Sequence, residues 1–271
     1  MNLSIMENKN MYIRNRKSII LILNRDDVLF LKPLDKFLKK NSFLIKHIYY
    51  TSFLLPNHDN RAYILSNIRI SNKFYLLKYM TKLFLKKVGC VFPLPLEKKR
   101  FLSIKTLAEY YSIPCSKVKD INKERFLEEL RVHKAEFVLS NTSQIYKRKI
   151  LRESGLKFYN FHPSLLPMNK GRFPIFWAIM NGEKQGITCH EIDEKIDHGK
   201  IVSQIEIDVG QGKTVEEVME IILEHTADFM NDSLQIILEG NIQYLKPIFQ
   251  SSYGPIPNRD DIKKYRSGEK L

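Results

Sequence analysis

The strongest constraint on the fold is an alternation of short apolar runs and amphipathic helical patterns along most of the chain. Ser18–Leu23 is continuously apolar, which is typical of a strand buried on both faces of a parallel sheet. Further strands are expected at Leu44–Tyr50, Phe137–Asn141, Leu156–His162, Gly186–Ile192 and Ile201–Val209. Helical patterns lie at Leu31–Lys40, Ser103–Tyr111, Lys123–His133, Tyr146–Ser154, Gly171–Asn181 and Thr214–Leu238.

This order predicts an α/β fold, a Rossmann-like and mostly parallel sheet flanked by helices. We expect one domain over residues 18–240, a flexible basic arm over residues 1–17 and a short C-terminal extension over residues 241–271. The first strand is followed by Asn-Arg-Asp-Asp, whereas nucleotide-phosphate loops need glycines there so that backbone N–H groups can approach the phosphates. A nicotinamide dehydrogenase and an NTPase are therefore not expected.

Composition excludes several other classes of protein. No apolar run approaches the roughly 20 residues that a bilayer-spanning helix needs, and the N-terminus lacks the pattern of a secretory signal. The three cysteines, Cys90, Cys115 and Cys189, show no C-x-x-C spacing, which argues against a disulfide scaffold or a zinc site. We expect a cytoplasmic protein without a metal.

The net charge of +14 is confined to the N-terminal third. Residues 1–100 hold 20 Lys and Arg against 6 Asp and Glu, whereas residues 101–271 hold 24 of each kind. Such a basic field would attract an anionic partner. The alternative is a compositional bias of the genome, since the chain is also rich in Asn and Ile.

Residues 73–88 form a basic amphipathic pattern, in which Phe74, Leu77, Phe84 and Val88 fall near one helical stripe. We favour a helix whose apolar stripe faces the core and whose lysines face solvent, over a helix that binds a membrane surface or a partner.

The residues best suited to chemistry lie between positions 158 and 202. Asn160 and His162 are two residues apart at the end of an expected strand, so their side chains point the same way, and Pro163 favours an extended backbone at His162. Asp197 lies in a turn between two strands that could return it to His162. An amide that donates to an oxyanion, an imidazole that moves a proton and a carboxylate that orients the imidazole suit acyl transfer to nitrogen.

The pattern N-x-H-P-S-L-L-P-x-x-x-G-x-x-P, followed by Trp-Ala, G-x-T-x-H and I-D-x-G, resembles the 10-formyltetrahydrofolate-dependent formyltransferases. This family includes nucleotide-sugar N-formyltransferases, glycinamide ribonucleotide formyltransferase and methionyl-tRNA formyltransferase, and the likeness is strong over residues 136–210. It implies the formyltransferase fold, with 10-formyltetrahydrofolate as co-substrate, no metal and residues 18–240 as the catalytic domain.

The resemblance also assigns residues to roles. Asn160, His162 and Asp197 match the catalytic triad of the family, and His190 matches a histidine near the active centre. His190 as a packed core histidine is the alternative, and Asp193 is expected as a turn residue. The positions that match folate-lining segments are Thr142, Ser143, Gln144, Ile145, Tyr146, Ser164, Leu165, Leu166, Pro167, Glu191 and Asp193.

The predicted acceptor is a small anionic amine, and a nucleotide-linked amino sugar is favoured. The glycine-rich turn with which glycinamide ribonucleotide formyltransferase grips a phosphate is missing, and the segment after the last helix is shorter than the C-terminal barrel of methionyl-tRNA formyltransferase. Nucleic acid is therefore not the expected partner, whereas a homodimer is compatible with the sequence. A 10-formyltetrahydrofolate hydrolase, methionyl-tRNA formylation and a non-catalytic folate-binding module remain as alternatives.

Overall fold

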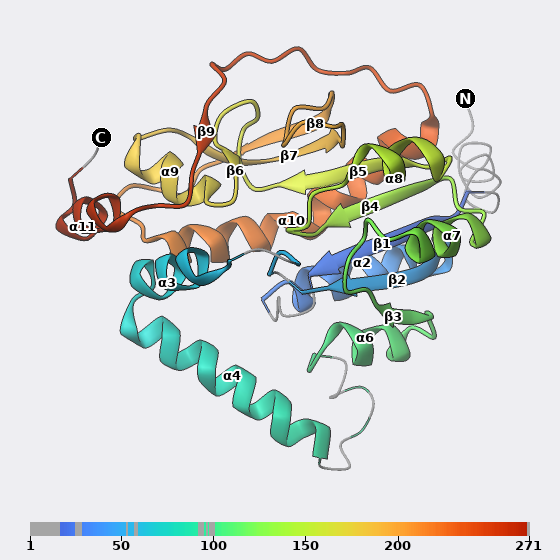
Figure 1. Cartoon of the computed structure of the whole chain (residues 1–271). Helices are drawn as coiled ribbons and strands as arrows, with labels where there is room; N and C mark the ends of the chain where they lie inside the picture. Colours follow the sequence, from blue (N-terminus) through green and yellow to red (C-terminus); the bar gives the residue numbers. More distant parts are fainter. Residues whose placement is uncertain are drawn as a thin grey trace, which may run out of the picture.

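The computed structural model describes residues 17–24, 29–52, 54–56, 59–91, 95, 97 and 101–269. Within these ranges the main sheet has seven strands in the order β3-β2-β1-β4-β5-β7-β8. The pairs from β3 to β5 are parallel, and β7 and β8 are added antiparallel at one edge (Figure 1). The prediction of a mostly parallel α/β sheet is confirmed, whereas the arm expected over residues 1–17 lies almost entirely outside the described residues.

The strands are β1 (Ile19–Asn24), β2 (Ile45–Thr51), β3 (Cys115–Lys117), β4 (Phe137–Asn141), β5 (Lys157–His162), β6 (Lys170–Gly171), β7 (Gln185–Glu191), β8 (Ile201–Ile207) and β9 (Tyr253–Gly254). The helices are α2 (Leu31–Asn41), α3 (Arg61–Ile70), α4 (Lys73–Val91), α6 (Ile104–Tyr110), α7 (Glu124–Val132), α8 (Arg148–Glu153), α9 (Pro174–Met180), α10 (Val215–Glu239) and α11 (Arg259–Ser267).

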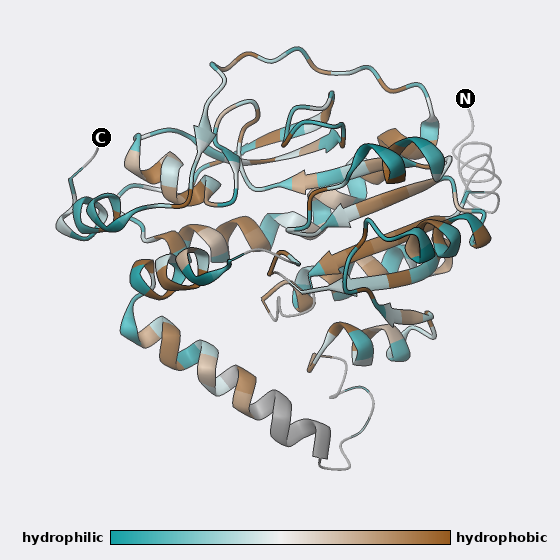
Figure 2. Cartoon of the chain, in the orientation of Figure 1, coloured by the Kyte–Doolittle hydropathy of each residue, from teal (hydrophilic) through white to brown (hydrophobic). Residues whose placement is uncertain are grey.

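Helices cover both faces of the sheet, because alternate residues of each central strand point to opposite sides. In β1, Ile19 and Leu21 pack with α2, α6 and α10, whereas Ile20 and Ile22 pack with α7 and α8. The apolar colouring of the central strands in Figure 2 reflects this burial on both faces. The continuously apolar run that predicted a buried strand is therefore explained.

The helix predicted from the basic amphipathic pattern is present as α4, but the expected direction of its apolar stripe is wrong. Phe74, Leu77 and Phe84 are all exposed, and the side chain of Val88 lies outside the described residues. A helical period shows which residues share a face, but it does not show whether another element covers that face.

The C-terminal extension carries structure that the sequence did not predict. Strand β9 pairs with β6, and α11 packs on α3. Ile262 of α11 is buried in a third apolar cluster with Phe176 and Trp177 of α9. The extension therefore lies beside the segment that follows β5 (Figure 1).

None of the helices in the described ranges combines the length and the apolar character that crossing a bilayer requires.

Candidate active site

The candidate site lies at the carboxyl end of β5, where Asn160 and His162 project on the same side of the strand. Strand β7 runs antiparallel beside β5 and places His190 opposite Asn160. Ligands of open α/β sheets bind beyond the carboxyl ends of the strands, near the point where the strand order reverses. Here β1 and β4 flank that point, and the loop after β4 opens into the same cavity.

The turn between β7 and β8 returns Asp197 to the histidines. Its Oδ2 lies 3.6 Å from His162 Nδ1, and its Oδ1 lies 3.7 Å from His190 Nε2. The backbone N–H of Gly171 donates a hydrogen bond of 2.9 Å to the same Oδ2. Asp197 has a φ of +48°, a left-handed conformation that is uncommon outside glycine and is held here by the surrounding contacts. The structure thus brings together the three residues that the sequence nominated.

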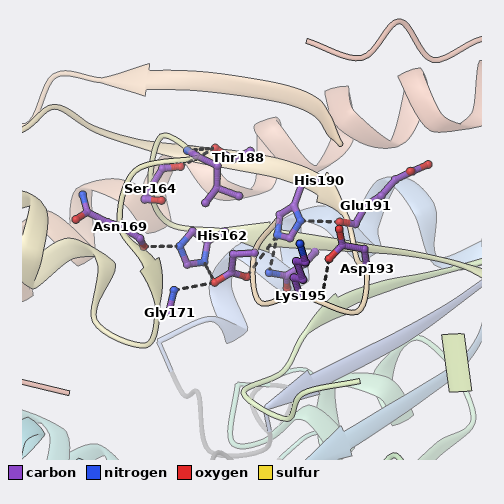
Figure 3. A network of polar contacts seen from close by, with 12 residues as sticks. His162, Ser164, Asn169, Gly171, Thr188, His190, Glu191, Asp193 and Lys195 are labelled. Atoms are coloured by element: carbon purple, nitrogen blue, oxygen red, sulfur yellow. Dashed lines mark hydrogen bonds and ion pairs between the residues drawn. The ribbon is translucent and has the colours of Figure 1, made fainter. Parts of the chain in front are cut away.

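The proton on His162 can be assigned from its partner. Nε2 lies 3.0 Å from the carbonyl oxygen of Asn169, which can only accept, so Nε2 carries a hydrogen (Figure 3). In the neutral ring Nδ1 is then the basic nitrogen, and it faces the Asp197 carboxylate. A proton that arrives at Nδ1 is stabilised by this carboxylate, so the pair is suited to accepting and releasing a proton.

His190 carries its hydrogen on Nδ1, whereas His162 carries it on Nε2. The Nδ1 of His190 donates to the carbonyl oxygen of Glu191 at 2.7 Å (Figure 3). Its Nε2 lies 3.3 Å from Nδ2 of Asn160. Burial lowers the pKa of His190 to about 4, so the ring is neutral at pH 7 and Nε2 accepts from Asn160. One N–H of the Asn160 amide is thereby engaged, and its second N–H remains for a ligand oxygen.

The I-D-x-G part of the motif has a steric explanation. A Cβ at Gly199 would overlap the carbonyl oxygen of Glu191, so only glycine allows the returning chain to pass so close to β7. Asp193 accepts the backbone N–H of Lys195 at 2.8 Å and contacts the ring of His198 at 3.1 Å. These bonds within the turn agree with the expectation that Asp193 is a turn residue.

A cavity of about 450 Å³ surrounds these side chains. It is lined by residues 140–146 at the end of β4 and beyond, by residues 160–163 at the end of β5, by His190 of β7, and by residues 192, 193 and 195–197 of the β7–β8 connection. The other lining residues are Asn24, Leu55, Asp59, Asn60, Tyr63, Gly171, Arg172, Pro174, Tyr253, Gly254 and Ile256. Its size lies in the range of small-molecule sites.

The predicted folate-lining segment Thr142–Tyr146 lies along this cavity. Several of its polar side chains are already engaged within the protein: Gln144 bonds backbone groups of Ile121 and Lys119, and the Tyr146 hydroxyl bonds Ser140. Thr142 and Ser143 are in turn tied to Thr51 and Asn24 at the ends of β2 and β1. The loop therefore has a fixed backbone, which is the part that could contact a ligand through N–H and C=O groups.

The second predicted folate-lining segment, Ser164–Pro167, lies outside the lining of this cavity. Ser164, Leu165 and Leu166 are buried, and the Ser164 hydroxyl donates to the carbonyl oxygen of Met168. Glu191 is also directed away, because its carboxylate accepts from the Tyr244 hydroxyl, whereas Asp193 lines the cavity. Both leucines of the motif are core residues, and Leu165 packs so closely on Gly186 that a Cβ at Gly186 would overlap its side chain.

Some residues at the site were not found by sequence reasoning. Asn169 acts through a backbone carbonyl, which leaves no mark in the choice of side chain. Arg172 stands with its guanidinium 3.6 Å from the centre of the Tyr63 ring, and both line the cavity. Arg172 occupies an unspecified position of the motif, directly after Gly171, whereas Tyr63 lies about a hundred residues away in the chain. Across the described ranges, no three His, Cys, Asp or Glu side chains come together in a way that could hold a metal ion.

Residues 98–234, which make up half of the chain, match the protein family described as formyl transferase. The chain belongs to the formyl transferase family. This confirms the resemblance seen in the sequence.

Two curated relatives show how far the likeness extends. The bifunctional polymyxin resistance protein ArnA of Wigglesworthia glossinidia brevipalpis is 34% identical over 54% of this chain and 23% of its own length. A methionyl-tRNA formyltransferase of Thermotoga maritima is 30% identical over 59% of this chain and 52% of its own length. The chain thus matches about half or less of the length of these relatives.

Solved structures share the fold at low identity. A sugar N-formyltransferase from Shewanella superposes with a TM-score of 0.56 at 18% identity, covering 88% of this chain and 76% of that one. A phosphoribosylglycinamide formyltransferase from Anaplasma phagocytophilum gives 0.57 at 18% identity, covering 88% and 98%. A sugar 3N-formyltransferase solved with dTDP and 5-N-formyl-THF gives 0.51 at 19% identity, covering 88% and 69%.

Proposed function

We propose that this protein transfers the formyl group of 10-formyltetrahydrofolate to the primary amine of a nucleotide-linked amino sugar. The observation that carries the proposal is the meeting of Asn160, His162 and Asp197 in one cavity, with His162 Nδ1 facing the Asp197 carboxylate at 3.6 Å. Membership of the formyl transferase family supports the chemistry.

Asn160 acts on the formyl oxygen. When the amine nitrogen bonds to the formyl carbon, the negative charge that develops on the oxygen needs a donor fixed in advance. The amide of Asn160 is held through one N–H by the neutral His190, which leaves the other N–H for this oxygen. A donor of this kind contributes roughly 3–4 kcal/mol where water is excluded.

His162 moves the proton. The attacking amine must lose a proton and the departing N10 must gain one, so one base that first accepts and then donates balances the reaction. The carbonyl of Asn169 keeps the hydrogen on Nε2, and Nδ1 takes up the transferred proton beside Asp197. Cleavage of the bond between N10 and the formyl carbon then completes the transfer.

Two groups of lining residues suit the two substrates. Residues 142–146 and 192–197 offer a rigid polar backbone for the flat pterin of the folate. Arg172, Tyr63 and Tyr253 also line the cavity, and their guanidinium and two phenol rings would receive an anionic sugar nucleotide. The basic N-terminal third adds a field that attracts such an acceptor. The names of the Shewanella and dTDP-bound fold neighbours agree with this acceptor class.

The test is a turnover assay of the purified protein with 10-formyltetrahydrofolate and a panel of amino-sugar nucleotides. We expect tetrahydrofolate to form only when an accepted amine is present, and the formylated amine to appear in equal amount by mass spectrometry. Folate turnover that needs no amine would replace the transferase with a hydrolase. No turnover with any amino sugar, but formylation of charged initiator tRNA with a steep dependence on salt, would reassign the acceptor to nucleic acid.

A His162→Ala variant separates catalysis from binding alone. We expect it to bind the folate and to lose turnover, because the ring does not belong to the wall proposed for the pterin. If the wild-type protein binds folate without any turnover and the variant behaves the same, the chain is a non-catalytic folate-binding module.

A further inference from the structure

Helix α4 presents a stripe of large apolar side chains to solvent. Phe74 is 84% exposed, Leu77 66%, Met80 61% and Phe84 65%. Isolated apolar residues are normal on protein surfaces, but a continuous row of them on one helix marks an interaction site. In Figure 1 this helix projects from the lower edge of the molecule, and Figure 2 shows its apolar segments.

The stripe is one side of the helix. Positions 74, 77, 80 and 84 follow the spacing of three and four residues that places side chains on a single face. The half-buried side chains Tyr75, Leu76, Tyr79 and Leu83 fall on a different face. The exposed face of α4 therefore carries an apolar stripe that also contains Lys73 and Thr81, and among the described residues no other element covers it.

The attachment of α4 leaves this face outward. Just before the helix, the backbone N–H of Asn72 donates to Glu216 of α10 at 2.9 Å. Six residues later Lys78 pairs with Glu220 of α10 at 2.8 Å. These two contacts fix the first turns of α4 against the start of α10 and do not involve the apolar stripe.

The charge of α4 is of one sign. The sequence of this helix contains five lysines and no acidic residue, and it lies within the segment of residues 1–100 that carries the whole positive excess of the chain. Lysines beside an apolar stripe are the pattern of helices that lie in a membrane interface, where the rings and aliphatic chains enter the acyl boundary and the ammonium groups reach the headgroups.

We propose that α4 binds the surface of an anionic lipid bilayer, lying in the interface with Phe74, Leu77, Met80 and Phe84 inserted. A second copy of this chain fits the face less well, because two such helices would bring their lysines together at low dielectric. An anionic surface is instead attracted by the positive charge of the helix, of which Lys78 is already paired with Glu220. This inference is independent of the proposed reaction, since no residue of the stripe lines the active-site cavity.

The test is co-sedimentation of the full-length protein with vesicles of phosphatidylcholine alone and of phosphatidylcholine mixed with phosphatidylglycerol. We expect binding to the mixed vesicles, weak binding to the neutral ones, and loss of binding as salt is raised. The double variant Phe74→Ser with Phe84→Ser should bind the mixed vesicles at least tenfold more weakly, because it lacks the two rings whose transfer from water into the bilayer favours binding. Lys73→Glu should weaken binding roughly fivefold or more.

Phe43→Ser is the matched control. Phe43 is 60% exposed but lies in the short turn before β2, so its loss should change vesicle binding by less than twofold. The thermal midpoint of each variant, compared with that of the wild type, reports that the fold is retained. Equal binding of the double variant and the control, or no binding of the wild type to mixed vesicles, would overturn the proposal. Self-association of the wild type in sedimentation equilibrium that the double variant abolishes would assign the face to a second copy.

Discussion

Replacement of Asp197 by Asn tests whether the charge of this carboxylate drives the reaction. Asn keeps the shape of the side chain and tolerates the left-handed conformation that Asp197 adopts at φ +48°. Its amide oxygen can still accept the N–H of Gly171, which now bonds Oδ2 at 2.9 Å. The substitution therefore removes the negative charge beside His162 while preserving the turn.

The size of the effect follows from the geometry. With His162 Nδ1 3.6 Å from the carboxylate, an effective dielectric constant of about 20 gives roughly 4–5 kcal/mol between the protonated ring and the charge. Partial exposure of Asp197 and screening by salt reduce this to about 2–4 kcal/mol. Since 1.4 kcal/mol corresponds to a factor of ten, we expect kcat to fall by roughly 30-fold to 1,000-fold.

The assay is steady-state formation of tetrahydrofolate with an accepted amine, with the midpoint of thermal unfolding measured in parallel. Asp208→Asn, in the exposed turn after β8, removes a carboxylate of the same kind far from the site and should leave kcat within twofold. An Asp197→Asn protein with a normal unfolding midpoint and more than a third of wild-type kcat would refute the charge argument, because the histidine would then work without its counter-ion.

Two further outcomes follow from buried groups. The folded-state pKa of His190, about 4, lies below its unfolded value of about 6.5, so the unfolded chain binds the proton first and the free energy of unfolding should fall by at most roughly 3 kcal/mol as pH drops from 6.5 to 4. Urea titrations at several pH values should show that the free energy of unfolding of His190→Gln falls less steeply with decreasing pH than that of the wild type. The same pH dependence in both proteins would contradict the burial of a neutral His190 ring. Gly254→Ala should lower the unfolding midpoint and also raise KM for the amine, because a Cβ there would overlap the Trp177 indole and displace Tyr253 from the cavity lining. An unchanged KM would show that this part of the lining does not touch the acceptor.

The part of the site that could be predicted from sequence is the part made by short-range geometry. Asn160 and His162 share a face because two residues separate them on a strand, and Pro163 keeps that strand extended. Asp197 could be placed near His162 because the connection between β7 and β8, residues 192–200, joins two paired antiparallel strands and so stays near the end of β7. The relation between Asn160 and His162 holds before any tertiary contact forms, whereas the position of Asp197 requires the pairing of β7 with β5 and β8.

The direction of α4 and the position of the cavity wall could not be predicted in this way. The periodicity of α4 shows which side chains share an apolar face, but not which element packs on that face. The prediction that this face turns to the core was wrong, because no element in the described part of the protein covers it. Tyr63 and Tyr253 meet at the cavity from opposite ends of the chain. Contacts at such separations depend on the packing of the whole fold and have no local signature in the sequence.

The C-terminal extension is connected to the proposed base through backbone hydrogen bonds. The carbonyl of Asn169 fixes His162, and the N–H of the same residue donates to the hydroxyl of Ser252 at 2.8 Å. The backbone of Ser252 also accepts from Lys170 and donates to Pro167, each at 3.1 Å. Ser252 is therefore a positioning residue: it holds the peptide that determines which nitrogen of His162 carries the hydrogen.

Removal of the hydroxyl in Ser252→Ala leaves the N–H of Asn169 without its acceptor, at a cost of about 1–2 kcal/mol. We expect kcat to fall roughly 3-fold to 10-fold with KM for the folate unchanged, and Ser252→Thr to restore kcat because it returns the hydroxyl. Ser251→Ala, at the exposed neighbouring position, is the matched control and should match the wild type. A purely structural role for Ser252 would lower the unfolding midpoint without changing kcat per folded molecule, and that result would separate the extension from the chemistry of His162.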